Sequence, residues 1–230
     1  MPLLGRAAML LTFDVAEEAI AEHDHWHTHE HLPERLSIPG FLRGTRWVAT
    51  AGSPRYLVLY EVDRLETLNS AAYLERLNNP TPWTQRIMPH YRGMTRGLCS
   101  VMESAGLGMG GFGLLLRFKP KPESHAPLDA WLGEVMSGLA GQRGVGSLHL
   151  LRSALAADMT SEQRIRGADS SLDWALLATR YSDAAVVALA QSELSAVSLE
   201  QQGATDVASA TYRAAYALTA QELVRDRHRE

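Results

Sequence analysis

Residues 8–42 read AMLLTFDVAEEAIAEHDHWHTHEHLPERLSIPGFL, and this stretch decides the fold. Residues 8–15 form an apolar run of strand length, residues 16–32 have helical composition, and the Ile-Pro-Gly sequence at 38–40 is a turn signal. Because the residue before a proline is driven out of the helical region, we expect Pro33 to end the helix. The stretch therefore predicts a strand, a long helix and a tight return into a second strand.

The same order of elements then occurs twice along the chain. In the first half, strands are predicted at 8–15, 41–50, 56–62 and 96–102, and helical segments at 16–32, 65–77 and 83–88. In the second half, strands are predicted at 112–118, 147–151, 174–181 and 209–218, and helices at 128–139 and 183–199. A polar loop is expected at 156–172 and a frayed, charged tail at 224–230.

Two β-α-β-β-α-β units in succession fit the ferredoxin-like pattern, in which both helices cover one face of an antiparallel sheet. The glycine-rich segment SAGLGMGGFG at 104–113 is the clearest punctuation between them. We therefore predict an α+β chain made of two tandem ferredoxin-like units, 1–105 and 106–230. A single larger α+β domain is the alternative.

Composition restricts the kind of partner. The 230 residues are 46% hydrophobic, which is enough for one large core or two small ones. A formal net charge of −4 gives no strong field for nucleic acid or an anionic membrane, so we expect neither partner. Cys99 is the single cysteine, and the first residues lack the pattern of a secretory signal. These features predict a cytoplasmic protein whose partner is a small organic molecule.

Five of the nine histidines fall at every second position from 23 to 31. A helical rotation of about 100° per residue places His25 and His29 on the solvent side. The side that faces the sheet receives four polar residues: His23, His27, Glu30 and His31. A buried polar group without a partner costs roughly 1–3 kcal/mol, so this face requires a strand residue, water or a ligand to satisfy it.

One hypothesis is a closed pocket in which Glu30 and His31, with His27 beside them, act as general acid and base. The substrate-binding residues expected around this pocket are Trp26, His23, Arg46, Trp47, Tyr60, Trp83 and His90. Arg46 or Tyr60 would stabilise a developing oxyanion. The alternative is a self-satisfied network, in which His31 caps the helix and Glu30 pairs with an arginine such as Arg35.

Metal binding is a further alternative. His27-Thr-His-Glu-His31 matches the H-x-x-E-H pattern of a zinc protease, but no supporting motif follows and the helix is expected to end at Pro33. His23, His27 and His31 recur every four residues and could hold a metal as imidazole ligands. Haem binding would require an axial ligand elsewhere, and His149 is the candidate.

Several ordered motifs resemble one family. Residues 26–36 (WHTHEHLPERL), the turn at 38–42 (IPGFL) and the arginine-bearing segment 43–46 (RGTR) resemble the EthD-like branch of the dimeric α/β-barrel superfamily. The segments PRYLVLYE at 54–61 and NPTPW at 79–83 are similar to the third strand and a later loop of that group. The resemblance covers about residues 8–103, and the second half lacks the Glu-His motif.

This resemblance implies that the two sheets pack into a barrel, so that one chain forms a pseudo-dimer that could still dimerise through other surfaces. It implies a cofactor-independent isomerase, cyclase or lyase that transfers a proton on a small apolar or aromatic carbonyl or lactone compound. Fold alone does not fix the reaction. The alternative is a non-catalytic protein that binds such a compound.

Overall fold

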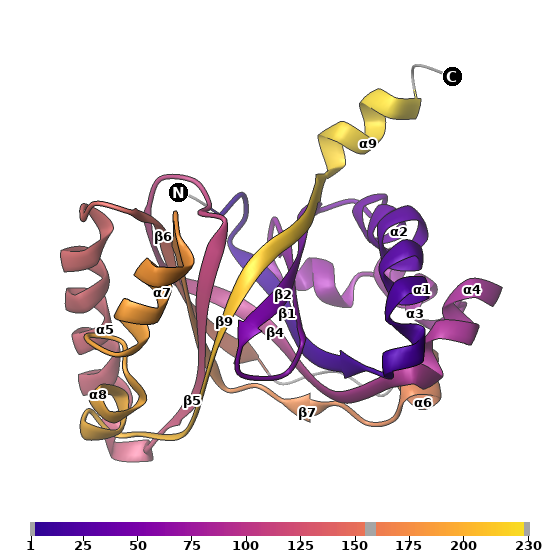
Figure 1. Ribbon diagram of the computed structural model, residues 1–230. Coiled ribbons are helices and arrows are strands. Elements are labelled where there is room, and N and C mark those ends of the chain that lie inside the picture. The colour runs from indigo at the N-terminus through magenta and orange to yellow at the C-terminus, as the bar shows by residue number, and fades with distance from the viewer. Residues whose placement is uncertain (1–2, 155–159, 228–230) are drawn as a thin grey trace.

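The computed structural model describes residues 3–154 and 160–227 (Figure 1). Eight antiparallel strands form a closed barrel in the order β1-β3-β2-β9-β5-β8-β6-β4, with β4 pairing back onto β1. These strands are β1 (Ala7–Val15), β2 (Phe41–Ala51), β3 (Tyr56–Val62), β4 (Tyr91–Gly106), β5 (Phe112–Pro120), β6 (Val145–Ala154), β8 (Trp174–Arg180) and β9 (Ala204–Thr219). A two-residue strand, β7 (Ser170–Ser171), pairs in parallel with β4.

The helices cover the barrel in two groups on opposite sides (Figure 1). The first group contains α1 (Ile20–Trp26), the π-helical segment His27–His31, α2 (Leu32–Leu36), a 3₁₀ turn (Leu65–Asn69), α3 (Ala71–Asn78) and α4 (Pro82–Ile87). The second group contains α5 (His125–Ala140), α7 (Asp183–Ala190) and α8 (Ala196–Gln201). The C-terminal α9 (Ala220–Arg227) projects from the end of β9 (Figure 1).

The predicted α+β class and antiparallel strands are confirmed. Each half of the chain also has the same internal strand order, β4-β1-β3-β2 in the first and β9-β5-β8-β6 in the second. This is the order in which the fourth strand of each half lies beside the first, and the third lies between the first and the second. The division into tandem units at residue 105 and the pseudo-dimer stay predictions.

The prediction that Pro33 ends the first helix is wrong. The chain passes through a π-helical segment, where the Leu32 N–H donates to the carbonyl of His27, and then continues as α2 to Leu36. Pro33 is the second residue of α2 and directly follows this wider helical turn. The helical segment therefore continues through Pro33 and ends at Leu36.

The prediction of a loop over 156–172 is also wrong in part. Residues 155–159 lie outside the described residues, but α6 (Ser161–Arg166) and β7 follow them. Thr160 caps α6, because its hydroxyl accepts from the Gln163 N–H while the Gln163 side chain accepts from the Thr160 N–H. Although α6 belongs to the second half of the sequence, it contacts α3 and lies with the first group of helices (Figure 1).

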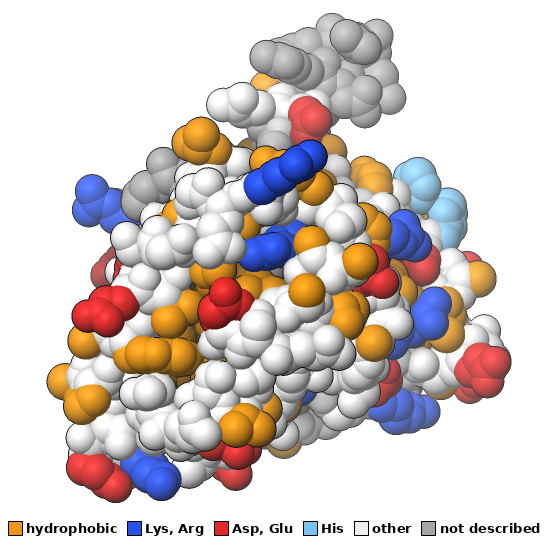
Figure 2. Space-filling model, turned by 60° about the vertical axis from the view of Figure 1, so that its left-hand side comes forward, with side chains coloured by type: hydrophobic (Ala, Val, Ile, Leu, Met, Phe, Trp, Pro, Cys, Tyr) orange, Lys and Arg blue, Asp and Glu red, His pale blue; other side chains and the backbone are white. Residues whose placement is uncertain are grey.

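Apolar side chains form three clusters that follow these layers. One fills the barrel and includes Leu10, Trp47 and Tyr212. The other two lie between the barrel and each group of helices. On the face turned forward in Figure 2, acidic and basic side chains are scattered among apolar ones and form no extended patch of one sign. Within the described residues, none of the helices has the length and apolar composition needed to span a bilayer.

Candidate functional site

Three histidines on one side of the first helical segment are buried against the sheet. Their exposed fractions are 0% for His23, 1% for His27 and 6% for His31. His25 and His29 are exposed, as the helical phase predicts. We call His23, His27 and His31 the histidine face.

The rings of the histidine face follow one another along the helix. The ring centroids of His23 and His27 are 5.7 Å apart, as are those of His27 and His31. Trp26 packs against the far end of this row, with its ring centroid 4.3 Å from that of His31. The π-helical segment spans His27 to His31, and such segments are frequent at functional sites.

The histidine face is only partly satisfied by hydrogen bonds. Nε2 of His23 lies 3.2 Å from the Tyr91 hydroxyl, and Nε2 of His27 lies 3.4 Å from the Tyr60 hydroxyl. The Nδ1 atoms of His27 and His31 are buried without a hydrogen-bond partner among the described residues. Buried polar atoms are normally paired, so two orphaned nitrogens on one helix face require an explanation.

Burial also controls the charge of these rings. Desolvation holds the pKa of His27 and of His31 well below the ordinary 6.5, and the positive charge of Arg35 adds to the effect at His31. The imidazoles are therefore neutral at pH 7 and have a lone pair available. A neutral buried imidazole can accept a proton from a bound molecule.

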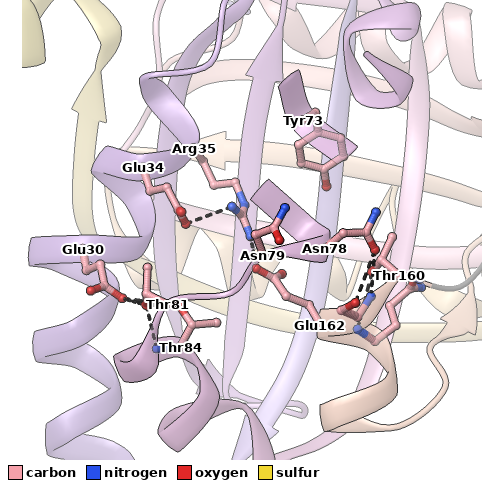
Figure 3. Close-up of polar contacts among 12 residues, drawn as sticks. Glu30, Glu34, Arg35, Tyr73, Asn78, Asn79, Thr81, Thr84, Thr160 and Glu162 are labelled. Carbon is pink, nitrogen blue, oxygen red and sulfur yellow. Dashed lines mark hydrogen bonds and ion pairs between the residues drawn. The ribbon is translucent and has the colours of Figure 1, made fainter. Parts of the chain in front are cut away.

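Glu30 points toward the start of α4, where Thr81 and Thr84 lie (Figure 3). Its Oε1 accepts from Nε1 of Trp26 at 3.0 Å, from the Thr81 hydroxyl at 2.5 Å and from the Thr84 hydroxyl at 3.3 Å. Consecutive helical residues differ by about 100° in direction, so Glu30 and His31 diverge. The structure does not join the predicted Glu-His pair by a hydrogen bond.

The other predicted pocket residues divide between three places. Tyr60 and Trp26 contact the histidine face, and Arg46 lies at its first turn, where Nη1 donates to the Asp24 carbonyl at 3.0 Å. Trp47 lies instead in the cluster inside the barrel. Adjacent residues of a strand point to opposite faces, so Arg46 and Trp47 could not line the same pocket.

Trp83 and His90 also lie apart from the histidine face. Nε1 of Trp83 donates to Glu22 at 2.8 Å, and its ring centroid is 5.4 Å from that of the exposed His25. His90 is half-buried at the end of a 3₁₀ turn, where its carbonyl accepts from the Ala16 N–H. Both residues belong to the outer edge of the helical layer.

Sequence reasoning missed a buried ionic cluster that begins one helical turn beyond His31. Arg35 is 1% exposed and donates to Glu34 at 3.0 Å and, at close range, to Glu162 of α6 (Figure 3). Arg166 lies 3.8 Å from Glu162 and 2.7 Å from Asp169. The capping-box spacing Thr160-x-x-Gln163 was the available signal for α6.

The metal and haem hypotheses gain no support from these residues. Within the described part of the chain, no group of three or more His, Cys, Asp or Glu side chains is arranged to hold a metal ion. His149 is 2% exposed, and its two ring nitrogens lie 2.8 Å from the Ser104 hydroxyl and 3.0 Å from the Ser147 hydroxyl. Because both nitrogens have partners, His149 does not fit as an axial haem ligand.

A cavity of about 240 Å³ opens beside α6 and β7. Its lining includes Arg96, Leu98, Gln163, Asp169 and Leu172. Gln163 and Asp169 are joined by a hydrogen bond of 2.9 Å. The cavity and the ionic cluster therefore share the short segment that contains α6.

Comparisons with known proteins identify the fold. No family model and no curated protein matches the chain. An anthrone oxidase-like protein has a TM-score of 0.70 at 13% identity, and the match covers 97% of each chain. A monooxygenase-like protein from Fusobacterium nucleatum has a TM-score of 0.62 at 8% identity and covers 94% of this chain and 96% of its own.

A further monooxygenase-like protein, from Lactobacillus acidophilus, has a TM-score of 0.59 at 10% identity and covers 93% of this chain and 96% of its own. At these identities the similarity is one of fold, which does not transfer an activity. The chain thus shares its fold with these proteins, and the assignment to the dimeric α/β-barrel superfamily and to its EthD-like branch stays a prediction.

Proposed function

We propose that this chain is a cofactor-independent enzyme of the isomerase, cyclase or lyase type that removes or returns a proton on a small apolar carbonyl or lactone compound. The observation that carries the proposal is the pair of buried Nδ1 atoms, on His27 and His31, that have no hydrogen-bond partner in the described part of the chain. An orphaned buried polar atom costs about 1–3 kcal/mol. A bound molecule that reacts there gives a reason for keeping them.

The residues have distinct roles in this proposal. His31 is the base, because it is the most exposed member of the histidine face and has a neutral imidazole at pH 7. Tyr60 donates a hydrogen bond to the oxyanion that forms when the carbon loses its proton. Glu30 is a positioning residue, since it holds the indole that packs on His31.

Deuterium exchange tests the proposed proton transfer without knowledge of the later steps. The protein is incubated in D₂O with a panel of aromatic ketones and lactones, and loss of the C–H signal next to the carbonyl is followed by ¹H NMR. Anthrone belongs in this panel because the name of one structural neighbour refers to it and because its methylene protons are acidic.

We expect the wild-type protein to accelerate exchange in at least one compound. His31→Gln should lower the rate about 100-fold or more, the usual contribution of a general base. His29→Gln is the matched control, because it changes an exposed histidine on the same helix. Equal rates for the wild type and His31→Gln would contradict the assignment of His31.

Binding without reaction is the second candidate function, supported by the same orphaned nitrogens. Thermal shift separates the two, because a ligand at 100 times its Kd adds about 2.7 kcal/mol to the free energy of unfolding. A compound that raises Tm in the wild type but shows no accelerated exchange identifies a binding protein. Uptake of dioxygen, measured in parallel, would identify an oxidase.

The proposed organisation is a pseudo-dimer of tandem units, 1–105 and 106–230, in a cytoplasmic protein that could form homodimers. The equal internal strand order of the two halves supports the tandem units. Light scattering of the purified chain measures whether it also dimerises.

A further inference from the structure

We propose that Glu162 of α6 is a built-in occupant of an anion site formed by Arg35 and Arg166, and that an organic carboxylate displaces it to bind beside His31. This inference rests on the proposed function and narrows its substrate class to carbonyl compounds that carry a carboxylate. The occupied site would keep the histidine face closed until such a compound arrives.

The first support is the burial of the Glu162 carboxylate between two guanidinium groups. Glu162 is 2% exposed, although glutamate is a residue that is rarely buried without a partner. One of its oxygens accepts from Nη2 of Arg35, and the other lies 3.8 Å from Nη1 of Arg166. Guanidinium groups bind carboxylates through directed hydrogen bonds, so the pair would hold a free carboxylate equally well.

The charge balance permits this exchange. Glu34 and Asp169 hold the outer sides of the two arginines, with distances of 3.0 Å to Arg35 and 2.7 Å to Arg166. A ligand carboxylate that replaces the carboxylate of Glu162 leaves the net charge of the cluster unchanged. Arg166 is the last residue of α6 and pairs with Asp169, so the exchange requires the first turn of α6, which carries Glu162, to move while Arg166 stays in place.

The second support is the position of the site relative to the proposed base. Arg35 follows His31 by four residues, and side chains at this spacing are neighbours on a helix surface. The charges of both arginines act on His31 and help to keep its imidazole neutral. A carboxylate held by the arginines would therefore place the rest of a small molecule next to the orphaned Nδ1 of His31.

The third support is that α6 is attached mainly by polar contacts. Within α6, Glu162 and Gln163 are buried and Ile165 is the apolar side chain that packs, only partly buried, on the first core cluster. The exposed Ser161 N–H donates to Asn78 at 3.1 Å. Segments with little buried apolar surface open at low free energy.

Benzoate and benzamide are the probes, because they share a shape and differ in charge. Backbone hydrogen exchange of the wild-type chain is measured by mass spectrometry with each probe. We expect benzoate to accelerate exchange in 161–166 several-fold and benzamide to leave it unchanged. Benzoate that binds without changing exchange in α6, or that fails to bind, would overturn the proposal.

Variants measure the competition directly by calorimetry. Glu162→Gln keeps the side-chain shape and removes the charge, and we expect it to bind benzoate at least tenfold more tightly than the wild type. Arg35→Gln should weaken binding by a similar factor. Glu200→Gln, an exposed position in α8, is the control and should equal the wild type. If a variant fails to fold, the exchange measurement on the wild type decides alone.

The outcomes separate this inference from the proposed function. If benzoate opens the first turn of α6 but His31→Gln leaves C–H exchange unchanged, the anion site stands and the proton-transfer role fails. If His31→Gln abolishes C–H exchange but benzoate does not move α6, the proton-transfer role stands and Glu162 is a structural ion-pair partner.

Discussion

Both groups of helices bury an apolar cluster against the barrel, but among the described residues the first group also buries a row of polar side chains. In the second half, α5 packs Leu128, Leu132, Met136 and Leu139 on the sheet, and every one is buried among apolar neighbours. In the first half, the corresponding layer buries His23, His27, His31 and Arg35. Both layers rest on four strands with the same internal order. The fold therefore does not need a polar helix face, which supports the proposal that the histidine face serves a function.

Breaking the ionic cluster should have the largest effect on stability. Arg35→Met removes one partner of a buried ion pair and leaves the Glu162 carboxylate with Arg166 alone, 3.8 Å away; breaking such a pair typically costs about 3–5 kcal/mol. Denaturant unfolding measures the change. Arg64→Met removes an exposed arginine from a surface pair and should change stability by less than about 1 kcal/mol. Equal effects of the two substitutions would contradict a buried cluster.

A cavity in the apolar layer should have the next largest effect. Leu132→Ala truncates a fully buried side chain of α5, and such changes cost about 2–5 kcal/mol. Denaturant unfolding gives the loss of stability, and C–H exchange by the folded fraction should equal that of the wild type. A loss of exchange activity in folded Leu132→Ala would show that the second layer takes part in the reaction.

The buried histidines of the first group of helices should make the stability of the chain depend on pH. His27 and His31 have a lowered pKa in the folded chain and an ordinary pKa near 6.5 in the unfolded chain. The unfolded chain therefore binds more protons below pH 6.5, so stability is complete above that pH and falls as the pH decreases. Each such histidine contributes up to about 1.4 kcal/mol per pH unit.

His31→Phe isolates the contribution of one histidine to this acid sensitivity. Unfolding curves between pH 7 and pH 5 should show a shallower loss of stability for His31→Phe than for the wild type. His29→Gln changes an exposed histidine and should retain the wild-type slope. Parallel curves for His31→Phe and the wild type would contradict a buried neutral imidazole at position 31.

At neutral pH the same substitution should have the smallest effect on stability. His31→Phe keeps a planar ring next to Trp26 and removes a nitrogen that has no partner. Replacing an unsatisfied polar group by an apolar one of similar shape is close to neutral, so we expect a change below about 1 kcal/mol. Differential scanning calorimetry measures it, and a loss of several kcal/mol would indicate a structural role for the imidazole.

Local patterns predicted much of this fold, because most strands combine β-branched, aromatic and alternating residues between turn signals. The helical phase also separated buried from exposed histidines correctly. The secondary-structure prediction failed where contacts within the folded chain overrode a local sequence rule. Pro33 is tolerated because a π-helical segment precedes it, and α6 forms within a polar sequence because its Glu162 pairs with Arg35.

The candidate site was predicted less well for a similar reason. Glu30 lies in the predicted motif, but its direction depends on Thr81 and Thr84, which come from a later helix. Arg35 and Glu162 are separated by 127 residues, so no local pattern could join them. The position of Trp47 could have been predicted from the sequence, because side chains alternate along a strand and Trp47 must therefore face the side opposite to Arg46.

The central claim is that His31 is kept for chemistry and not for stability. The most direct test compares wild-type and His31→Phe proteins in one set of samples, with the free energy of unfolding and the rate of C–H exchange in a responsive carbonyl compound both measured. We predict equal stability within about 1 kcal/mol and a rate at least about 100-fold lower for the variant. An unchanged rate, or a collapse in stability, would contradict the account.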